Sequence, residues 1–146
     1  MSSISVGVVI FIIHSVGLPR RCYKEQIVIG TYNQEIEQEL KEKYPHLLRG
    51  ASVGSARDFV LTQYLGVNIF DKGDFSCLQI PMSYELKGIA LDLVAKTITK
   101  RAHRRGIAVQ YWTINDPEEM AYLQSIGADA IMTDVPDEAA DVLVQP

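Results

Sequence analysis

The amino-acid sequence predicts an α/β fold in which four or five strand-helix units share a parallel sheet. First, short apolar runs that end in turn residues alternate with helical stretches of about ten to fifteen residues, which is typical of βαβ units. Second, 47% hydrophobic and 22% charged residues indicate an ordinary globular domain. Third, 146 residues suit one domain. A closed eight-stranded barrel does not fit, because it usually requires roughly 250 residues.

The first unit is a strand at residues 27–29 and a helix capped at Asn33. Three apolar residues followed by Gly30 are typical of a parallel strand that is buried on both faces. The helix repeats apolar residues at a spacing of four and ends before Pro45; these residues are Ile36, Leu40 and Tyr44.

The middle of the chain predicts a turn of small residues at 50–54, a helix at 57–64 and a short strand at 78–80 that ends at Pro81. One face of the next predicted helix consists of Leu91, Val94, Ala95, Ile98 and Ala102. That helix ends with basic residues and a glycine, as helix C-termini commonly do, at His103, Arg104, Arg105 and Gly106.

The last two units begin with a strand at 107–113 and end with a helix that Asp137 opens. Between them, the N-cap, N1 and N3 positions of a strong helix start are filled by Asp116, Pro117 and Glu119. Met120 and Leu123 form the buried stripe of this helix, Gly127 ends it, and the final strand covers 130–133.

Charge and cysteine content exclude several classes of function. With 14 basic and 18 acidic residues, the formal net charge is −4, so we expect no nucleic-acid partner. Cys22 and Cys77 are too few for a disulfide framework and too far apart for a zinc knuckle. A reduced compartment is therefore expected, and we predict a cytoplasmic location.

Residues 1–24 form an apolar N-terminal segment, in which residues 4–18 are interrupted only by serines, glycines and His14. The run is shorter than a membrane span. Basic residues follow it, whereas a secretory signal carries them in front. We expect a buried helix or strand, for example a helix of a truncated barrel, and no membrane interaction; a role as signal or anchor stays open.

Residues 102–136 resemble the C-terminal end of glycerophosphodiester phosphodiesterases. Members of that family combine an Ala-His-x-x-Gly helix end, a strand that finishes in Trp-Thr-x-Asn, and the run Gly-x-Asp-x-Ile-x-Thr-Asp-x-Pro. The matching positions here are Ala102, His103, Gly106, Trp112, Thr113, Asn115, Gly127, Asp129, Ile131, Thr133, Asp134 and Pro136. A fainter similarity at 78–81 and 27–32 extends the resemblance back to Leu18.

The resemblance implies that residues 25–146 are the C-terminal part of a TIM (β/α)8 barrel, so the fold would be a partial barrel of about four or five strand-helix units. It also implies the family's reaction in lipid metabolism, the hydrolysis of glycerophosphodiesters to glycerol 3-phosphate and an alcohol with a divalent cation, calcium or magnesium. In the family, an early His-Arg-Gly and a later His-Asp supply the acid and base histidines, and Glu-x-Asp and Glu-x-Lys supply the metal carboxylates, all on the first three strands of the barrel. A hard cation needs several such oxygens, so we expect the chain alone to be inactive.

Three segments resemble those motifs in part, but they lack a required residue or the strand setting of the motif. His14 follows an apolar run but lacks the arginine after it, and Leu48 stands where a histidine would precede Arg49. The run 85–87, Glu-Leu-Lys, is expected in a solvated turn. We therefore assign no catalytic residue and no metal ligand in this sequence.

Four other charged or titratable residues have structural explanations. His103 is expected to complement the dipole at a helix C-terminus, and Glu118 and Glu119 the dipole at a helix N-terminus. The family comparison implies that Asp134 organises the top of the barrel rather than binding metal.

Trp112 is the strongest candidate for substrate contact. The C-terminal ends of barrel strands face the active site, and Trp112 lies near the end of its predicted strand. An indole offers an apolar face to the glycerol carbons and an N–H donor, although core packing explains the residue equally well. Gln79 and Thr31, also at strand ends, are the other candidates for lining this mouth.

Three interpretations of the whole chain follow. The first is part of a phosphodiesterase, whose partners would be a glycerophosphodiester and an N-terminal half-barrel. The second is a non-catalytic half-barrel for binding or scaffolding that self-associates, because exposed parallel edges and an uncovered interior are costly. The third is a small α/β domain in which residues 4–18 cover an open edge. We favour the first, without its catalytic apparatus.

Overall fold

The computed structural model of the protein describes residues 28–65, 74–86, 89–93 and 96–143. The predicted N-terminal segment 1–24 and His14 lie outside these ranges. Within them, five parallel strands are each followed along the chain by a helix, with one antiparallel hairpin inserted after the third strand.

The five parallel strands form one continuous row. They are β1 (Val28–Ile29), β2 (Leu48–Arg49), β3 (Cys77–Ile80), β6 (Ala108–Tyr111) and β7 (Ala130–Ile131). β1 pairs with β2, β3 with β6, and β6 with β7. A parallel bridge between Gly50 and Cys77 connects β2 to β3. The strands therefore follow one another in chain order, as they do around a TIM barrel.

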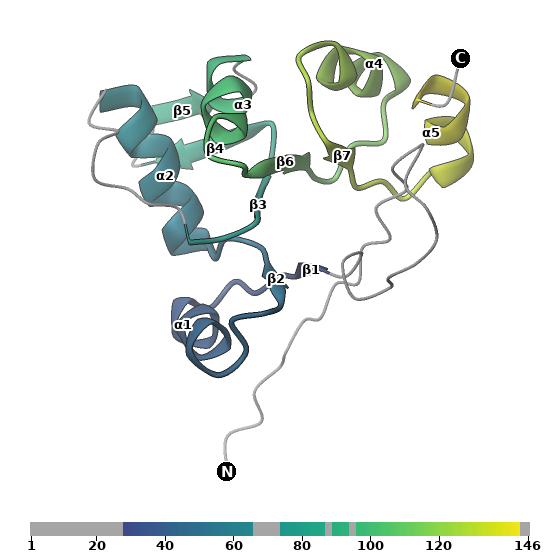
Figure 1. Ribbon diagram of the computed structural model, residues 1–146. Helices are drawn as coiled ribbons and strands as arrows, with labels where there is room; N and C mark the ends of the chain where they lie inside the picture. Colours follow the sequence, from purple (N-terminus) through teal and green to yellow (C-terminus); the bar gives the residue numbers. More distant parts are fainter. Residues whose placement is uncertain (1–27, 66–73, 87–88, 94–95, 144–146) are drawn as a thin grey trace.

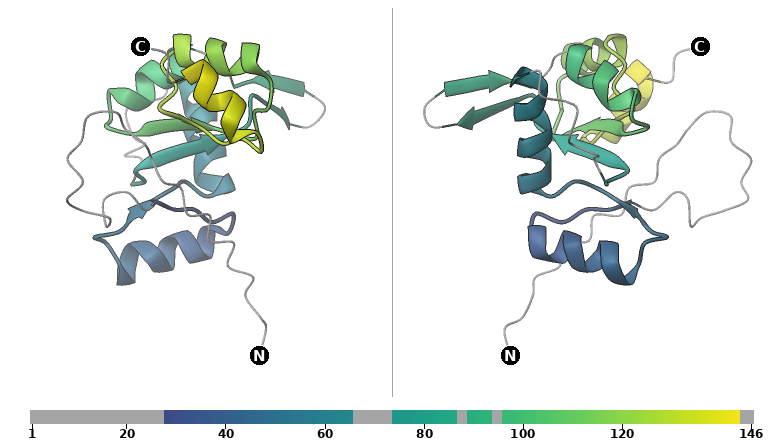
Figure 2. Two further views of the ribbon diagram at one scale, coloured as in Figure 1. Left: turned by 90° about the vertical axis from the view of Figure 1, so that its right-hand side faces the viewer. Right: turned by 60° about the vertical axis from the view of Figure 1, so that its left-hand side comes forward.

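Five helices lie along the outer side of this row (Figure 1). They are α1 (Gln34–Lys43), α2 (Val53–Leu65), α3 (Lys96–His103), α4 (Pro117–Ser125) and α5 (Pro136–Leu143). In the two views of Figure 2, α1 lies below the strands, and α3, α4 and α5 lie above them. The prediction of an α/β fold with parallel strands and four or five strand-helix units is confirmed.

β3 and β6 separate two faces of different chemistry, because successive side chains of a strand point to opposite sides. Toward the helices lie buried apolar residues that join the core, Leu78, Ile80, Val109 and Tyr111. They pack with helix residues that include Phe59 of α2, Ile98 of α3 and Met120 of α4. Gln79 and Gln110 lie on the opposite, inner face, and they occupy paired positions of the two strands.

The predicted helix starts at Asn33 and Asp116 are confirmed. Asn33 Oδ1 accepts the backbone N–H of Glu35 at 2.7 Å. Asp116 Oδ1 accepts the N–H groups of Glu118 at 2.8 Å and Glu119 at 3.1 Å. Each cap satisfies amides that would otherwise lack a partner in the first helical turn.

The predicted helix that includes Leu91 is wrong in its first part. There, β4 (Ser83–Leu86) and β5 (Ile89–Asp92) form an antiparallel hairpin, and α3 begins only at Lys96. An apolar spacing of three and four over so few residues fits a short strand as well as a helix. The expected turn at 85–87 is corrected too, since Glu85 and Leu86 belong to β4.

The prediction for 48–57 also needs correction. Two residues form the unpredicted strand β2, which is too short to show a hydrophobic period. Of the expected turn of small residues at 50–54, Val53 and Gly54 already belong to α2, which starts at Val53. Ser52 Oγ accepts the N–H of Ser55 at 3.3 Å, so a serine side chain supports the first turn of this helix.

Candidate functional site

A pocket of about 340 Å³ lies where the carboxyl ends of the parallel strands meet. We call it the mouth pocket. Residues that end or follow β1, β3, β6 and β7 line it, among them Thr31, Gln79, Trp112 and Thr133. The three residues that the sequence predicts at a common mouth, Thr31, Gln79 and Trp112, are thus brought together here. Their contact with a substrate stays a prediction.

Gln79 is held in place on the inner face of the strands. Its Nε2 donates to Gln110 Oε1 at 2.9 Å. Its Oε1 lies so close to Gly30 and Gly50 that a Cβ on either glycine would stand 2.7 Å from it. The two glycines therefore create the space for this side chain, and its carboxamide forms a fixed wall of the mouth pocket.

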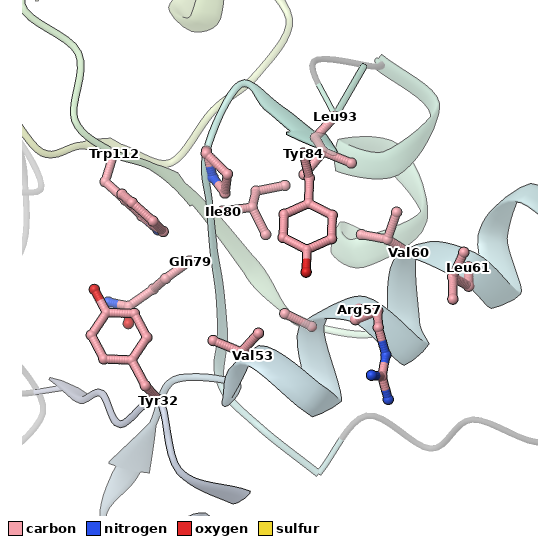
Figure 3. Close-up of a pocket in the computed structure, with 12 residues that line it drawn as sticks. Tyr32, Val53, Arg57, Val60, Leu61, Gln79, Ile80, Tyr84, Leu93 and Trp112 are labelled. Atoms are coloured by element: carbon pink, nitrogen blue, oxygen red, sulfur yellow. The ribbon is translucent and has the colours of Figure 1, made fainter. Parts of the chain in front are cut away.

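Trp112 follows β6 and stands at the boundary of two pockets. Its backbone N–H donates to the carbonyl of Ile80 at 3.2 Å, which keeps it beside β3. Its partly buried side chain lies outside the buried core. The indole lines the mouth pocket as well as a second pocket, with Gln79 next to it (Figure 3). One apolar ring face is therefore available to a ligand at the mouth.

Thr31 and Tyr32 form the wall that follows β1. The hydroxyl oxygen of Thr31 accepts the N–H of Asn33 at 3.2 Å, just before α1. Tyr32 is 70% exposed and lines both pockets. Tyr32 was not predicted from the sequence, although it follows a strand directly, as the three predicted residues do.

Asn115 joins the loops that follow β6 and β7. Its Oδ1 accepts from the Thr133 hydroxyl at 3.0 Å and from the Asp134 N–H at 2.9 Å, while its Nδ2 donates to Asp134 Oδ2 at 3.2 Å. Asp134 lines the mouth pocket. These bonds connect Asp134 to the loop after β6; the organising role that the family resemblance implies for Asp134 stays a prediction.

A second pocket of about 130 Å³ adjoins the mouth pocket, and we call it the side pocket. Its walls come from α2, the end of β3 and the hairpin strand β4 (Figure 3). Tyr32, Val53, Gln79 and Trp112 line both pockets. The side pocket was not predictable from the sequence, because one of its walls is Tyr84 on the unpredicted hairpin.

His103 lies at the opposite end of the strands. It ends α3, just before β6, and its Nε2 is 2.7 Å from Asp129 Oδ2. The same carboxylate oxygen accepts the backbone N–H of the buried Val109 at 2.7 Å. We therefore assign His103 a structural role; the sequence missed its carboxylate partner because residue 129 is 26 positions away.

Among the described residues, no group of three or more His, Cys, Asp or Glu side chains is placed so that it could hold a metal ion. Asp134 brings one carboxylate to the mouth pocket, and this carboxylate already accepts the Asn115 amide. Hard divalent cations require several oxygen ligands. The part of the chain that the structure describes therefore does not fit a complete divalent-cation site.

The buried Cys77 is not an activated nucleophile. It lies on β3 with 1% exposure, and burial raises the pKa of its thiol to about 12. Because the thiolate is the reactive form, a raised pKa leaves this thiol inert at neutral pH. Its sulfur faces Gly50, where an added Cβ would lie 3.5 Å away.

Comparison with solved structures shows the fold. A candidate glycerophosphoryl diester phosphodiesterase from Silicibacter pomeroyi is 17% identical with a TM-score of 0.58, over 83% of this chain and 39% of the other. A glycerophosphodiester phosphodiesterase from Parabacteroides distasonis is 17% identical with a TM-score of 0.56, over 83% and 44%. An Oleispira antarctica phosphodiesterase, solved with the product sn-glycerol-3-phosphate, is 18% identical with a TM-score of 0.55, over 81% and 42%.

This chain thus spans less than half the length of each of these proteins. In the described residues, no helix has the length and apolar character needed to cross a membrane. A search of curated proteins gave no match. The model of the glycerophosphoryl diester phosphodiesterase family matches residues 21–138, most of the sequence. The chain therefore belongs to the glycerophosphoryl diester phosphodiesterase family.

Proposed function

We propose that this chain forms the glycerol-binding side of the mouth of a glycerophosphodiester phosphodiesterase barrel. The reaction is the hydrolysis of a glycerophosphodiester to glycerol 3-phosphate and an alcohol. The observation that carries the proposal is the position of Thr31, Gln79 and Trp112 on one pocket at the carboxyl ends of the strands. In TIM barrels this end holds the active site.

The lining of the mouth pocket suits a glycerol unit. The indole of Trp112 offers an apolar face to the three carbons, while the Gln79 carboxamide and the Thr133 hydroxyl offer polar atoms to the glycerol hydroxyls. The hydrogen bond to Gln110 fixes Gln79 before a ligand arrives. A fixed polar group costs little ordering entropy on binding.

The family is generally metal-dependent. Calcium or magnesium is our proposal for the cation, which would offset phosphate charge when it is bound. Because the described residues do not fit a complete site for it, we propose that cation ligands and the acid and base belong to other residues. Under this proposal the chain alone binds glycerol 3-phosphate but does not hydrolyse a glycerophosphodiester. It acts in the cytoplasm without a nucleic-acid or membrane partner.

We further propose that the inner face of the strands is covered by an N-terminal half-barrel or by a second copy of the chain. Gln110 is 1% exposed, and its Nε2 has no hydrogen-bond partner. A buried donor without a partner costs about 1–3 kcal/mol. An added half-barrel would bring backbone and side-chain acceptors to this inner layer and would pair the outer edges of β1 and β7.

Binding and turnover test the function separately. Calorimetric titration of the purified chain with glycerol 3-phosphate should show binding, and Trp112→Ala should weaken it at least tenfold. Tyr122→Ala removes an exposed aromatic side chain on α4, away from the mouth, and should leave the affinity unchanged. Equal affinity of the Trp112 variant and the parent chain would refute the proposed site.

The turnover assay measures release of glycerol 3-phosphate from glycerophosphocholine with calcium or magnesium. We expect no release by the chain alone. Metal-dependent release that a chelator abolishes would show that this chain contains the whole apparatus. Sedimentation distinguishes the two ways of covering the inner face. A chain that is covered by a second copy sediments as a dimer or larger species, whereas a chain that needs an N-terminal half-barrel sediments as a monomer when it is alone.

A further inference from the structure

A third pocket, of about 490 Å³, lies on the exposed side of α3 and shares no residue with the mouth pocket or the side pocket. Most of its wall comes from α3 and the turn that follows it, and the rest comes from the end of α4. We call it the basic pocket, and its lining consists of Lys96, Thr99, Lys100, His103, Arg104 and Ile126.

The positive charge of the chain is concentrated at this helix. Residues 96–105 contain five of the 14 lysines and arginines and no acidic residue, although the formal net charge of the chain is −4. Lys96, Lys100 and Arg104 follow one another at a spacing of four, which places them on one side of a helix. The opposite side carries Ile98 and Ala102, which are buried in the core. The basic side chains therefore all face the same pocket.

These charges are not neutralised by neighbouring carboxylates. Lys96, Lys100 and Arg104 are exposed, and none of them forms an ion pair within the described part of the chain. No carboxylate lines the basic pocket. Asp129 reaches its edge through His103, but this carboxylate is bound to His103 Nε2 at 2.7 Å and to the Val109 N–H at 2.7 Å. Three cationic groups are thus available to a ligand.

Thr99 brings a buried hydroxyl without a partner to the same pocket. The residue is 1% exposed, and its Oγ1 has no hydrogen-bond partner. Its methyl group faces Gly127, where an added Cβ would lie 3.7 Å from Cγ2. A buried hydroxyl that lacks a partner destabilises a fold, so such a group calls for an explanation. An acceptor atom of a ligand in the basic pocket would supply the missing bond, because a threonine hydroxyl can donate.

The helix dipoles oppose an anion here, but only weakly. The C-terminal ends of α3 and α4, at His103 and Ile126, each carry the equivalent of about half a negative charge. Lys96, Lys100 and Arg104 together carry three full positive charges. The basic side chains therefore outweigh the two helix ends, and the pocket attracts anions.

We propose that the basic pocket binds the phosphate group of a phosphomonoester. Such a group carries a charge of about −1.5 to −2 at neutral pH and three strong acceptor oxygens. The two lysines and Arg104 offset its charge, and the Thr99 hydroxyl donates to one of its oxygens. A carboxylate has one charge and two oxygens, so it uses fewer of these groups. The site is separate from the mouth pocket and does not depend on the glycerol-binding role proposed there.

Nuclear magnetic resonance locates the binding. Spectra of the full ¹⁵N-labelled chain are recorded at neutral pH with inorganic phosphate as the probe, while potassium chloride keeps the ionic strength constant. We expect saturable shifts of the amide signals of Lys100 and Gly127, which belong to or adjoin the pocket. The indole N–H signal of Trp112, the single tryptophan, should not move. Acetate should bind at least about tenfold more weakly, because it has half the charge.

Thr99→Val removes the hydroxyl and keeps the shape of the side chain. It should weaken phosphate binding about tenfold, since a hydrogen bond to a charged group is lost. It should also raise the melting temperature of the free chain, because a buried group without a partner is removed. Thr97→Val is the matched control, since residue 97 is exposed on the same helix outside the pocket, and it should keep the parent affinity.

Lys100→Gln gives a second test that does not disturb the core, because this side chain is exposed. It should also weaken phosphate binding about tenfold. Lys43→Gln, at the exposed end of α1, removes the same charge away from the pocket and should have no effect. If Thr99→Val does not fold by circular dichroism, the comparison of the two lysine variants decides.

The outcomes are distinct. Thr99→Val with a lowered melting temperature and unchanged phosphate affinity would overturn the proposal and leave Thr99 a structural role. Equal binding of acetate and phosphate, equal effects of the two lysine variants, or no saturable shift would also overturn it. A shift of the Trp112 signal alone would place phosphate at the mouth and so support the proposed function instead of this site.

Vesicles identify where the phosphomonoester comes from. Phosphatidylcholine vesicles with and without phosphatidate, which carries a phosphomonoester headgroup, are sedimented with the chain. Binding that requires phosphatidate and that Lys100→Gln weakens would support the site with a lipid as its source. Binding of inorganic phosphate without binding of these vesicles would support a dissolved phosphomonoester, which we expect because the proposed function includes no membrane partner.

Discussion

Substitution of Gly50 by alanine tests whether the inner face is as tightly packed as the structure indicates. A Cβ on Gly50 would lie 2.7 Å from Oε1 and 3.2 Å from Cδ of Gln79. Gln79 cannot move away freely, because its Nε2 is bonded to the buried Gln110. Overpacking of this kind costs about 1–3 kcal/mol. For a chain of this length, that loss lowers the melting temperature by about 2–12 °C.

Gly54→Ala is the matched control. A Cβ on Gly54 would lie 2.8 Å from Oε1 of Gln34, which is nearly the same close approach. Gln34, however, is exposed at the start of α1 and can turn into solvent. Since Gly54 lies in α2, alanine there should stabilise the helix by about 0.5–1 kcal/mol.

Thermal and urea denaturation, followed by circular dichroism, measure both effects. In the Gln79→Ala background the Gly50→Ala penalty should largely disappear, because the clashing carboxamide is gone. A full penalty in that background, or equal effects of the two glycine substitutions, would refute the argument from packing.

Three further predictions concern stability. Asp129→Ala leaves the buried N–H of Val109 without its acceptor and should cost about 1–3 kcal/mol in urea titrations. His103→Ala removes only an exposed side-chain contact to Asp129 and should cost under about 1 kcal/mol; equal costs of the two substitutions would contradict this difference. Asp116→Ala removes a cap that serves two amides of α4 and should lower the melting temperature by about 2–4 °C, for a loss of about 1 kcal/mol. The pKa of Cys77 is raised from 9.0 to about 12, so the unfolded chain loses this proton first and stability falls as pH rises from 9 to 12. Cys77→Ala should show a shallower fall over that range, and an identical slope would contradict the assignment.

Much of the fold was predictable because its signals are local. The Asp116 cap is made within three residues along the chain, and the apolar residues Ile107, Ala108 and Val109 mark the strand before it. The hairpin at 83–92 was not predictable by the same means, since alternating and helical spacing cannot be told apart over four residues. The two-residue strand β2 depends on its neighbours β1 and β3, which no local pattern reveals.

The candidate site also contains residues that were predictable from the sequence and residues that were not. Thr31, Gln79 and Trp112 were predictable as neighbours because the carboxyl ends of parallel strands share one edge. The side pocket was not, because its wall at Tyr84 comes from the unpredicted hairpin. The pairing of His103 with Asp129 likewise joins residues that only the folded chain brings together.

The bonds made by Asn115 have a consequence for recognition at the rim of the barrel. One amide side chain satisfies donors and an acceptor from two residues of the loop after β7, while it belongs to the loop after β6. The two loops consequently behave as a single rigid unit, and a ligand finds that side of the rim already assembled. Selectivity can then change through the exposed Tyr32 at the mouth, while the two loops keep their arrangement.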